Sequence, residues 1–292
     1  MKNAFLFLFV FSFTLSYGQA GSEIYLFNMK VKNGQVVLSG GVNITNHKGY
    51  DNQPFFHPSE PIIYYSSFND SGRSDIRYFD YKKKTTVDFI ITTDYREYSP
   101  TVRPDGQWVS LIIQKPNGDQ DLGMYPVLKN KKPMILINDL KIGYHAWVDN
   151  SKLLLFVLED SIRHTLHYYN LSAKEDTVLA ENIGRSLHRI PDQNAMSFIQ
   201  KISDSVSIVK RFDPVTLSIT TLIATVKGSD HIAWLKNNTI LTSSGDQIFY
   251  YQLNREAPWQ PVIVEGDISM LKGVTRMAVN ADNTKLAVVV SE

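Results

Sequence analysis

The sequence contains no cysteine, and this absence excludes several classes of protein. No disulfide can staple the fold, no lipid-modified cysteine can tether the chain to a membrane, and no thiol can serve as a nucleophile. An exported chain without disulfides fits a bacterial periplasm or the bacterial exterior better than a eukaryotic secretory route.

An excess of charge of either sign is also missing, because 30 Lys and Arg residues are balanced by 29 Asp and Glu residues. A nucleic-acid binder normally carries a basic excess on at least one face. The one basic run, residues 82–84, falls where a hairpin turn is expected, and we interpret it as a solvated loop tip. No nucleic-acid partner is therefore expected.

Long apolar runs are absent except at the beginning of the chain. Lys2 precedes an almost wholly apolar stretch from Ala4 to Leu15, and small residues follow it. This pattern predicts a signal peptide over residues 1–20, cleaved after Gly18 or Ala20, since the apolar core is too short to span a bilayer. The alternative is a buried N-terminal strand or helix. We expect a periplasmic or secreted protein with no transmembrane segment in the mature chain.

Aromatic residues make up 12% of the sequence and accompany many Val, Ile and Thr, a composition that favours strands. A turn unit followed by an apolar run recurs six times. Its turn positions are separated by 43 to 46 residues and are occupied by Ser59, Asp105, Asp149, Asp192, Lys236 and Asp282. Pro, Asp, Asn and Gly around these positions supply the dihedral angles and side-chain hydrogen bonds that tight turns need.

A second unit, in which aromatic residues follow an apolar one, recurs between the turns, as at residues 75–80, 165–170 and 247–251. A further apolar strand follows each copy, as at residues 261–264. Each period therefore carries four strands, and both the period and the strand count are typical of a propeller blade. Because an isolated blade cannot cover both faces of its sheet, residues 21–292 are expected to form a single domain.

The two ends of the sequence complement each other. The last repeat stops after two strands, and the missing outer strands are found at residues 23–28 and 35–38. The sequence thus predicts an all-β, six-bladed β-propeller with four-stranded blades. The ring would be closed by N-terminal outer strands that pair with C-terminal inner strands. The alternative is a β-sandwich with coincidental spacing.

One turn unit also carries a family resemblance. The run from Ser99 to Trp108 resembles the signature repeat of the TolB-type propellers, S-P-x-[FW]-S-P-D-G, and residues 67–76 are similar to the hairpin that follows it in that family. The resemblance implies the propeller fold, an envelope or exterior setting, and a habit of binding proteins or peptides on a face of the ring. True TolB has a small α/β domain ahead of its propeller, for which residues 21–35 leave no room, so the Tol–Pal role is not carried over.

Loops that enter the first strand of each blade form one mouth of the central channel, and the candidate binding residues are assigned there. They are Arg96, Tyr98, Tyr144, His145, Arg185, His188, Asp230, His231 and Arg276. Counted from the turns, His145 and His188 occupy equivalent positions and His231 is one residue off.

Arg96, Arg185 and Arg276 come from alternate turns around the ring and could hold a carboxylate through bidentate contacts. In the alternative, they are solvated arginines paired with Asp94 or Asp230. Three histidines suggest a metal, but ligands must lie within about 2 Å of one ion, which blades across a channel do not permit. No metal and no cofactor are expected.

No catalytic motif stands out, since the sequence lacks a G-x-S-x-G elbow and the α/β domain of propeller peptidases. The expected function is a non-catalytic, monomeric module that binds or scaffolds an envelope or extracellular protein or peptide. The alternative is an enzyme for a small molecule or glycan, of the metal-dependent lactonase or lyase type, with its site at the channel mouth. A propeller that works only beside a separately encoded partner is a third interpretation.

Overall fold

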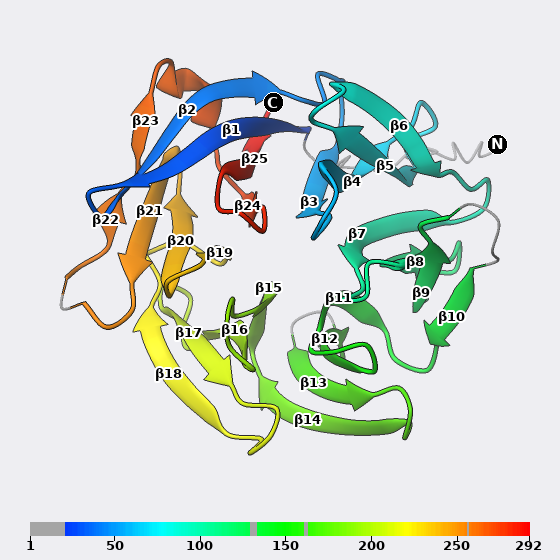
Figure 1. Ribbon diagram of the computed structural model, residues 1–292. Helices are drawn as coiled ribbons and strands as arrows, with labels where there is room; N and C mark the ends of the chain where they lie inside the picture. Colours follow the sequence, from blue (N-terminus) through cyan, green and yellow to red (C-terminus); the bar gives the residue numbers. More distant parts are fainter. Residues whose placement is uncertain (1–20, 129–132, 161–162, 256) are drawn as a thin grey trace, which may run out of the picture.

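The computed structural model describes residues 21–128, 133–160, 163–255 and 257–292. Six sheets stand around a central axis like the blades of a propeller, and each sheet begins with a strand next to that axis (Figure 1). The all-β, six-bladed prediction is confirmed. The predicted signal peptide, residues 1–20, lies outside the described residues. Among the described residues, no helix has the length and apolar character needed to cross a membrane.

Blades 1 to 5 follow one another along the chain, and each is an antiparallel sheet ordered from the axis outward. Blade 1 contains β3 (Asp51–Phe56), β4 (Ile62–Phe68), β5 (Ser74–Asp80) and β6 (Thr85–Ile90). Blade 2 contains β7 (Arg96–Val102), β8 (Trp108–Gln114), β9 (Gln120–Pro126) and β10 (Met134–Ile137). Blade 3 contains β11 (Ile142–Trp147), β12 (Lys152–Leu158), β13 (His164–Asn170) and β14 (Glu175–Glu181).

Blade 4 contains β15 (Ile183–Arg189), β16 (Met196–Lys201), β17 (Ser207–Phe212) and β18 (Ile219–Ala224). Blade 5 contains β19 (Ile232–Leu235), β20 (Thr239–Ser244), β21 (Gln247–Gln252) and β22 (Gln260–Pro261). Blade 6 contains β24 (Arg276–Val279), β25 (Lys285–Ser291), β1 (Ser22–Lys32) and β2 (Gln35–Asn43), with β23 (Ile263–Glu265) outside β2. The short 3₁₀ helix η1 (Ile268–Leu271) precedes β24.

Blade 6 is built from both ends of the chain, as the sequence predicted. β1 pairs antiparallel with β25 from Ser22 opposite Ser291 to Asn28 opposite Lys285. On its other side β1 pairs with β2, so the N-terminal strands supply the outer half of this sheet. The ring is therefore closed by main-chain hydrogen bonds between segments at opposite ends of the sequence.

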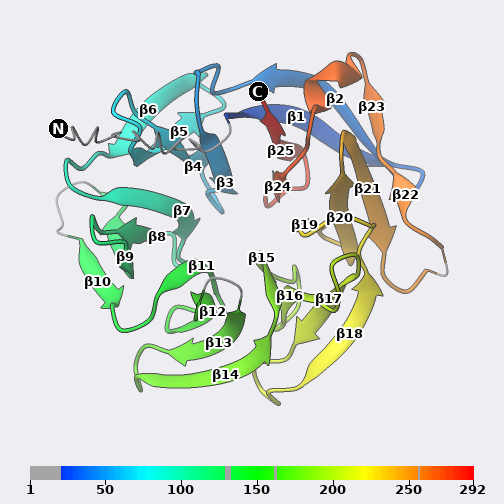
Figure 2. The same cartoon turned by 180° about the vertical axis from the view of Figure 1, so that it is seen from behind.

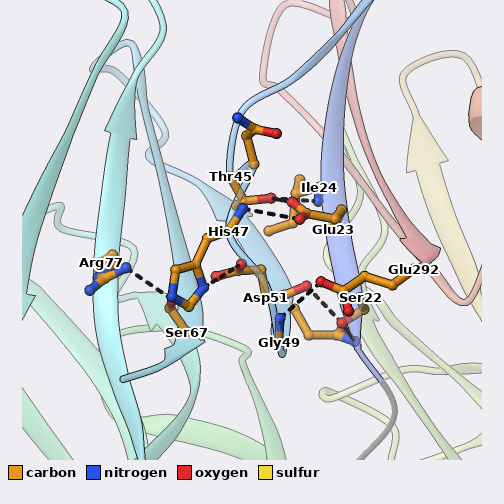
Figure 3. A network of polar contacts seen from close by, with 12 residues as sticks. Ser22, Glu23, Ile24, Thr45, His47, Gly49, Asp51, Ser67, Arg77 and Glu292 are labelled. Atoms are coloured by element: carbon orange, nitrogen blue, oxygen red, sulfur yellow. Dashed lines mark hydrogen bonds and ion pairs between the residues drawn. The ribbon is translucent and has the colours of Figure 1, made fainter. Parts of the chain in front are cut away.

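Polar contacts reinforce this seam where blade 6 meets blade 1 (Figure 3). The Glu292 carboxylate accepts a hydrogen bond from the Gly49 amide at 2.9 Å, and the Ser22 hydroxyl donates to the Asp51 carbonyl at 3.0 Å. Glu23 accepts hydrogen bonds from the Thr45 hydroxyl and from the His47 amide. The seam thus joins the beginning of β1 and the C-terminal Glu292 to the segment that leads into β3.

The strand after β21 differs from the prediction. Residues 261–264 were expected to form the last strand of one blade, but the structure divides the segment between two sheets. Pro261 ends β22, and β23 then pairs in parallel with β2, with Ile263 opposite Val37. Pro261 lies opposite Phe249, and the Val262 amide still donates to the Ile248 carbonyl at 2.9 Å, so the ladder of blade 5 extends one residue beyond the proline before the chain passes to blade 6.

Apolar layers between neighbouring blades form the core of the ring. Blades 1 and 2 enclose Tyr64, Ile76 and Leu111, all at most 2% exposed. Blades 5 and 6 enclose a layer that contains Leu241 and Val288, both fully buried. Each blade is therefore stabilised by the blades beside it, as stacking of repeats requires.

Two tryptophans make the same inter-blade contact two blades apart. The indole N–H of Trp147 donates to the Ser110 hydroxyl and that of Trp234 to the Ser197 hydroxyl, each at 2.8 Å. The serines differ in their other contacts, because Ser110 also meets Nε2 of His145 at 2.6 Å whereas Ser197 has no other side-chain partner among the described residues.

Trp234→Phe is expected to destabilise the ring more than Trp147→Phe, by about 1 kcal/mol. Both substitutions remove similar apolar area and one hydrogen bond, but only the first leaves a buried hydroxyl without a side-chain partner. Urea unfolding of both variants measures the difference. Equal midpoints and equal slopes would contradict this account of the serine contacts.

Candidate functional site

A cavity of about 620 Å³ lies at the centre of the ring. The inner strands β3, β7, β11, β15, β19 and β24 surround the axis in both views of the ring (Figures 1 and 2). The lining extends from these strands to the turns that follow them, as at Pro58, Pro104, Pro191 and Asn283. We call this end of the cavity its mouth; it is the end opposite to the one formed by the loops that enter the inner strands, where the mouth was predicted from the sequence. None of the loops that lead into the inner strands, residues 91–95, 138–141 and 225–230, contributes a lining residue.

Six residues near one level of the inner strands form what we call the polar ring. Each lies four residues before the residue that closes the turn at the end of its strand, as Gln53 lies before His57 and Arg276 before Asn280. The members are Gln53, Ser99, Tyr144, Ser186, His231 and Arg276, and all six line the cavity. The deep end of the cavity is thus polar all round.

Irregular backbone positions two members of the polar ring. Gln53 and Ser99 have φ values of +59° and +53°, each at a break in strand register and each followed by proline. The Gln53 side-chain oxygen accepts hydrogen bonds from the Ser99 amide at 2.6 Å and from the Ser66 hydroxyl at 2.7 Å. Left-handed backbone is costly for these residue types, so these contacts compensate for strain beside the cavity.

At the deep end of the cavity, opposite the mouth, arginine side chains take the place of the apolar side chains of the wall. Cζ of Arg276 lies 5.0 Å from the centroid of the Tyr144 ring. Burial alone would raise the pKa of the Tyr144 phenol, but the positive charges of Arg276 and Arg185 outweigh burial and lower it. The same two guanidinium groups therefore act on one point of the polar ring.

The three histidines line the cavity but are not equivalent in register. His145 lies three residues before the turn-closing Val148, His188 two before Ile190, and His231 four before Leu235. The predicted equivalence of His145 and His188 was wrong because the turn after β15 contains one more residue than the turn after β11. Neighbouring positions in a strand point to opposite faces, so the imidazoles do not converge on one level.

Burial keeps these imidazoles neutral at physiological pH. It lowers the pKa of His145 to about 3 and, with the charge of Arg276, that of His188 to about 4. The pKa of His231 lies well below its usual range for the same reasons. His145 and His188 also contact serine hydroxyls, at Ser110 (2.6 Å) and Ser186 (2.9 Å). Over the described ranges of the chain, no three His, Asp or Glu side chains are grouped so that they could hold a metal ion.

Six of the nine residues proposed from the sequence line the cavity. They are Tyr144, His145, Arg185, His188, His231 and Arg276. The other three, Arg96, Tyr98 and Asp230, lie towards the loops before the inner strands and are not lining residues. In the part of the chain that the structure describes, neither Arg96 nor Arg185 nor Arg276 is in an ion pair, so the expected pairing with Asp94 or Asp230 is not seen.

Sequence reasoning missed much of the wall. Phe55, Trp147 and Trp234 line the cavity together with Pro54 and Pro100, and the polar ring includes Gln53 and Ser99. A partial signal was present, because each member of the polar ring lies five or six residues before the turn position that the sequence marks in its repeat. The constant spacing of four residues is measured from the turn-closing hydrogen bond, which only the structure shows.

Comparison with known proteins identifies the fold only. No family model matches the sequence, and no curated protein matches it. Among solved structures, a putative TolB from Agrobacterium tumefaciens matches 94% of this chain and 99% of its own at a TM-score of 0.69 and 11% identity. A chain of a nidogen/laminin complex matches 88% of this chain and 98% of its own at a TM-score of 0.64 and 6% identity.

Two further matches cover less of the neighbour. TolB from Acinetobacter baumannii matches 93% of this chain but 64% of its own, at a TM-score of 0.58 and 15% identity. An oligogalacturonate lyase in complex with manganese matches 89% of this chain and 81% of its own, at a TM-score of 0.57 and 12% identity. The fold is that of the TolB-like six-bladed propellers, which are found among binding proteins and enzymes alike.

Proposed function

We propose that this chain is a non-catalytic binding module that holds a segment of a protein or peptide in the central cavity. The observation that carries the proposal is the cavity itself, whose volume of about 620 Å³ lies within the range of about 300–1,000 Å³ typical of ligand sites. Proline and aromatic side chains contribute apolar surface to its wall, and the polar ring lies at its deep end. This combination suits an extended segment with apolar side chains and a few polar anchors.

The likeness to TolB proteins and to a chain of a nidogen/laminin complex supports a binding role by analogy of fold. The analogy with TolB also supports the setting that we propose, which is the periplasm or the exterior of a bacterium. The sequence pattern of residues 1–20 agrees with export. In this proposal the chain acts as a monomer and has no nucleic-acid partner.

An enzyme of the metal-dependent lactonase or lyase type is the alternative, and the manganese-bound lyase among the structural neighbours makes it worth stating. The cavity of the present chain favours it less. Its three histidines lie at different levels, and Arg185 and Arg276 place positive charge beside them. Positive charge opposes the approach of a divalent cation.

Blocking the cavity is expected to abolish partner retention. Thr101→Trp places a large side chain in the cavity wall, whereas Thr177→Trp places the same side chain on the exposed outer strand β14. Crosslinking pull-downs from envelope extract should retain the same proteins with the unsubstituted chain and with Thr177→Trp, and lose them with Thr101→Trp. An identical set of retained proteins for all three would contradict binding in the cavity.

A further inference from the structure

The charges that line the cavity are unbalanced, although the charges of the whole sequence nearly cancel. Four cationic side chains and one carboxylate line it: Arg185, Arg189, Lys236 and Arg276 against Asp192. Because the histidines are neutral, they do not alter this balance at physiological pH. A cavity that carries a surplus of positive charge attracts an anion.

Two of the four cations, Arg185 and Arg276, lie at the deep end of the cavity. The other two are placed differently. Arg189 donates a hydrogen bond from Nη1 to the Val148 carbonyl at 2.7 Å, and Lys236 belongs to the turn at the mouth. Arg185 and Arg276 remain, and both act on Tyr144 at the polar ring. Neither is in an ion pair among the residues that the structure describes.

We propose that Arg185 and Arg276 bind a carboxylate of the peptide segment, while the proline and aromatic wall towards the mouth holds the apolar residues beside it. A guanidinium matches a carboxylate through two parallel hydrogen bonds, which is the strongest common contact for this anion. The carboxylate is the α-carboxylate of a peptide terminus or the side chain of an acidic residue.

The apolar part of the wall, as distinct from its polar side chains, favours a peptide over an acidic sugar. Phe55, Phe56 and the proline rings of Pro54, Pro58 and Pro100 offer no hydrogen-bonding side-chain group to the hydroxyls that cover a sugar. A hydroxyl that loses water without gaining a partner costs binding free energy. The apolar side chains of a peptide gain from the same surface.

This inference rests on the proposed function, and the following experiment distinguishes failure of the inference from failure of the proposed function. Three fluorescein-labelled pools of pentapeptides with apolar residues are compared by fluorescence anisotropy. One pool ends in a free α-carboxylate, one is amidated, and one is amidated but contains a single glutamate. A galacturonate dimer serves as an unlabelled competitor.

The free-acid pool, the glutamate pool or both should bind at least about tenfold more tightly than the amidated pool. Which of the two binds identifies the source of the carboxylate. Arg185→Met with Arg276→Met should reduce the affinity for both carboxylate pools to that for the amidated pool, because methionine keeps an unbranched apolar stem and removes the guanidinium charge. Arg211→Met, which removes an arginine that is paired with Asp213 outside the cavity, should change nothing.

Two results would overturn the inference. Equal binding of all three pools would leave a peptide-binding cavity that does not read a carboxylate. Displacement of the acid pool by the galacturonate dimer at lower concentration than by free-acid peptide would assign the cavity to acidic sugars. Absence of binding by every pool would instead count against the proposed function itself. The comparison of acid with amide uses the unsubstituted protein, so it holds even where a variant fails to fold.

Discussion

A chain that lacks residues 23–38 is expected to lose cooperative folding altogether. The deletion removes Ile24, Phe27, Met29 and Leu38, which are all at most 2% exposed, and it uncovers one edge of β25. Full burial of each such side chain is worth about 1.5–3 kcal/mol, whereas domains are stable by only about 5–15 kcal/mol. Circular dichroism during heating should show no cooperative transition.

A permuted chain provides the matched control. The Glu292 amide donates to the Gly21 carbonyl at 3.1 Å, so a short linker can join residue 292 to residue 21. Opening the chain after Asn46, in the exposed loop before β3, then moves β1 and β2 to the C-terminus without altering a strand. This variant should melt cooperatively. A truncated chain that melts as cooperatively as the full one would disprove closure through β1.

Replacing Glu97 by glutamine is expected to stabilise the fold at pH 8 by about 1–3 kcal/mol and to have little effect at pH 4. Glu97 is fully buried on β7, and burial raises the pKa of its carboxyl from 4.5 to about 7, with a further contribution from Asp75. Thr92 donates to Oε1 at 2.8 Å, while Oε2 has no hydrogen-bond partner among the described residues. Arg73 and the Thr92 contact oppose the rise in part.

The sign follows from proton binding. Below about pH 4.5 the carboxyl is protonated in both the folded and the unfolded chain. Between about pH 4.5 and pH 7 the unfolded chain loses this proton while the folded chain keeps it, so the free energy of unfolding falls as the pH rises. Asp51, whose pKa burial raises to about 6, contributes in the same direction between about pH 4 and pH 6.

Urea unfolding of Glu97→Gln at several pH values measures this effect. Glu175→Gln, which changes an exposed glutamate on β14, serves as the matched control and should follow the unsubstituted chain. A constant difference between Glu97→Gln and the unsubstituted chain from pH 4 to pH 8 would show that ionisation of Glu97 does not destabilise the fold.

The architecture was predictable because its signals are local and repeated. Turn residues at regular spacing predict four strands in each period, and the incomplete last repeat predicts that residues 23–38 complete it. The exception was the segment after β21, where one expected strand is divided between two sheets from Pro261 to Ile263. Periodicity alone carries no information about such a switch.

The candidate site was predictable only in part, because the register of the inner strands depends on the length of each turn. One additional residue between Ile190 and Ala195 moves His188 to the other face relative to His145. The β-bulges at Gln53 and Ser99 also depend on tertiary contacts, such as the hydrogen bond from the Ser99 amide to the Gln53 side chain. Arg185 and Arg276 were identified because, with Arg96, they recur at alternate turns around the ring.

The direction of the strands in blade 6 determines which side of the molecule is free for attachment. β24 runs from the polar ring towards the mouth, β25 runs back, and β1 lies antiparallel to β25. Ser22 and Ser291 therefore lie on the face opposite the mouth. A fusion partner, a label or a solid support joined after residue 292 would therefore leave the mouth of the cavity facing the solution, so the protein can be immobilised without covering it.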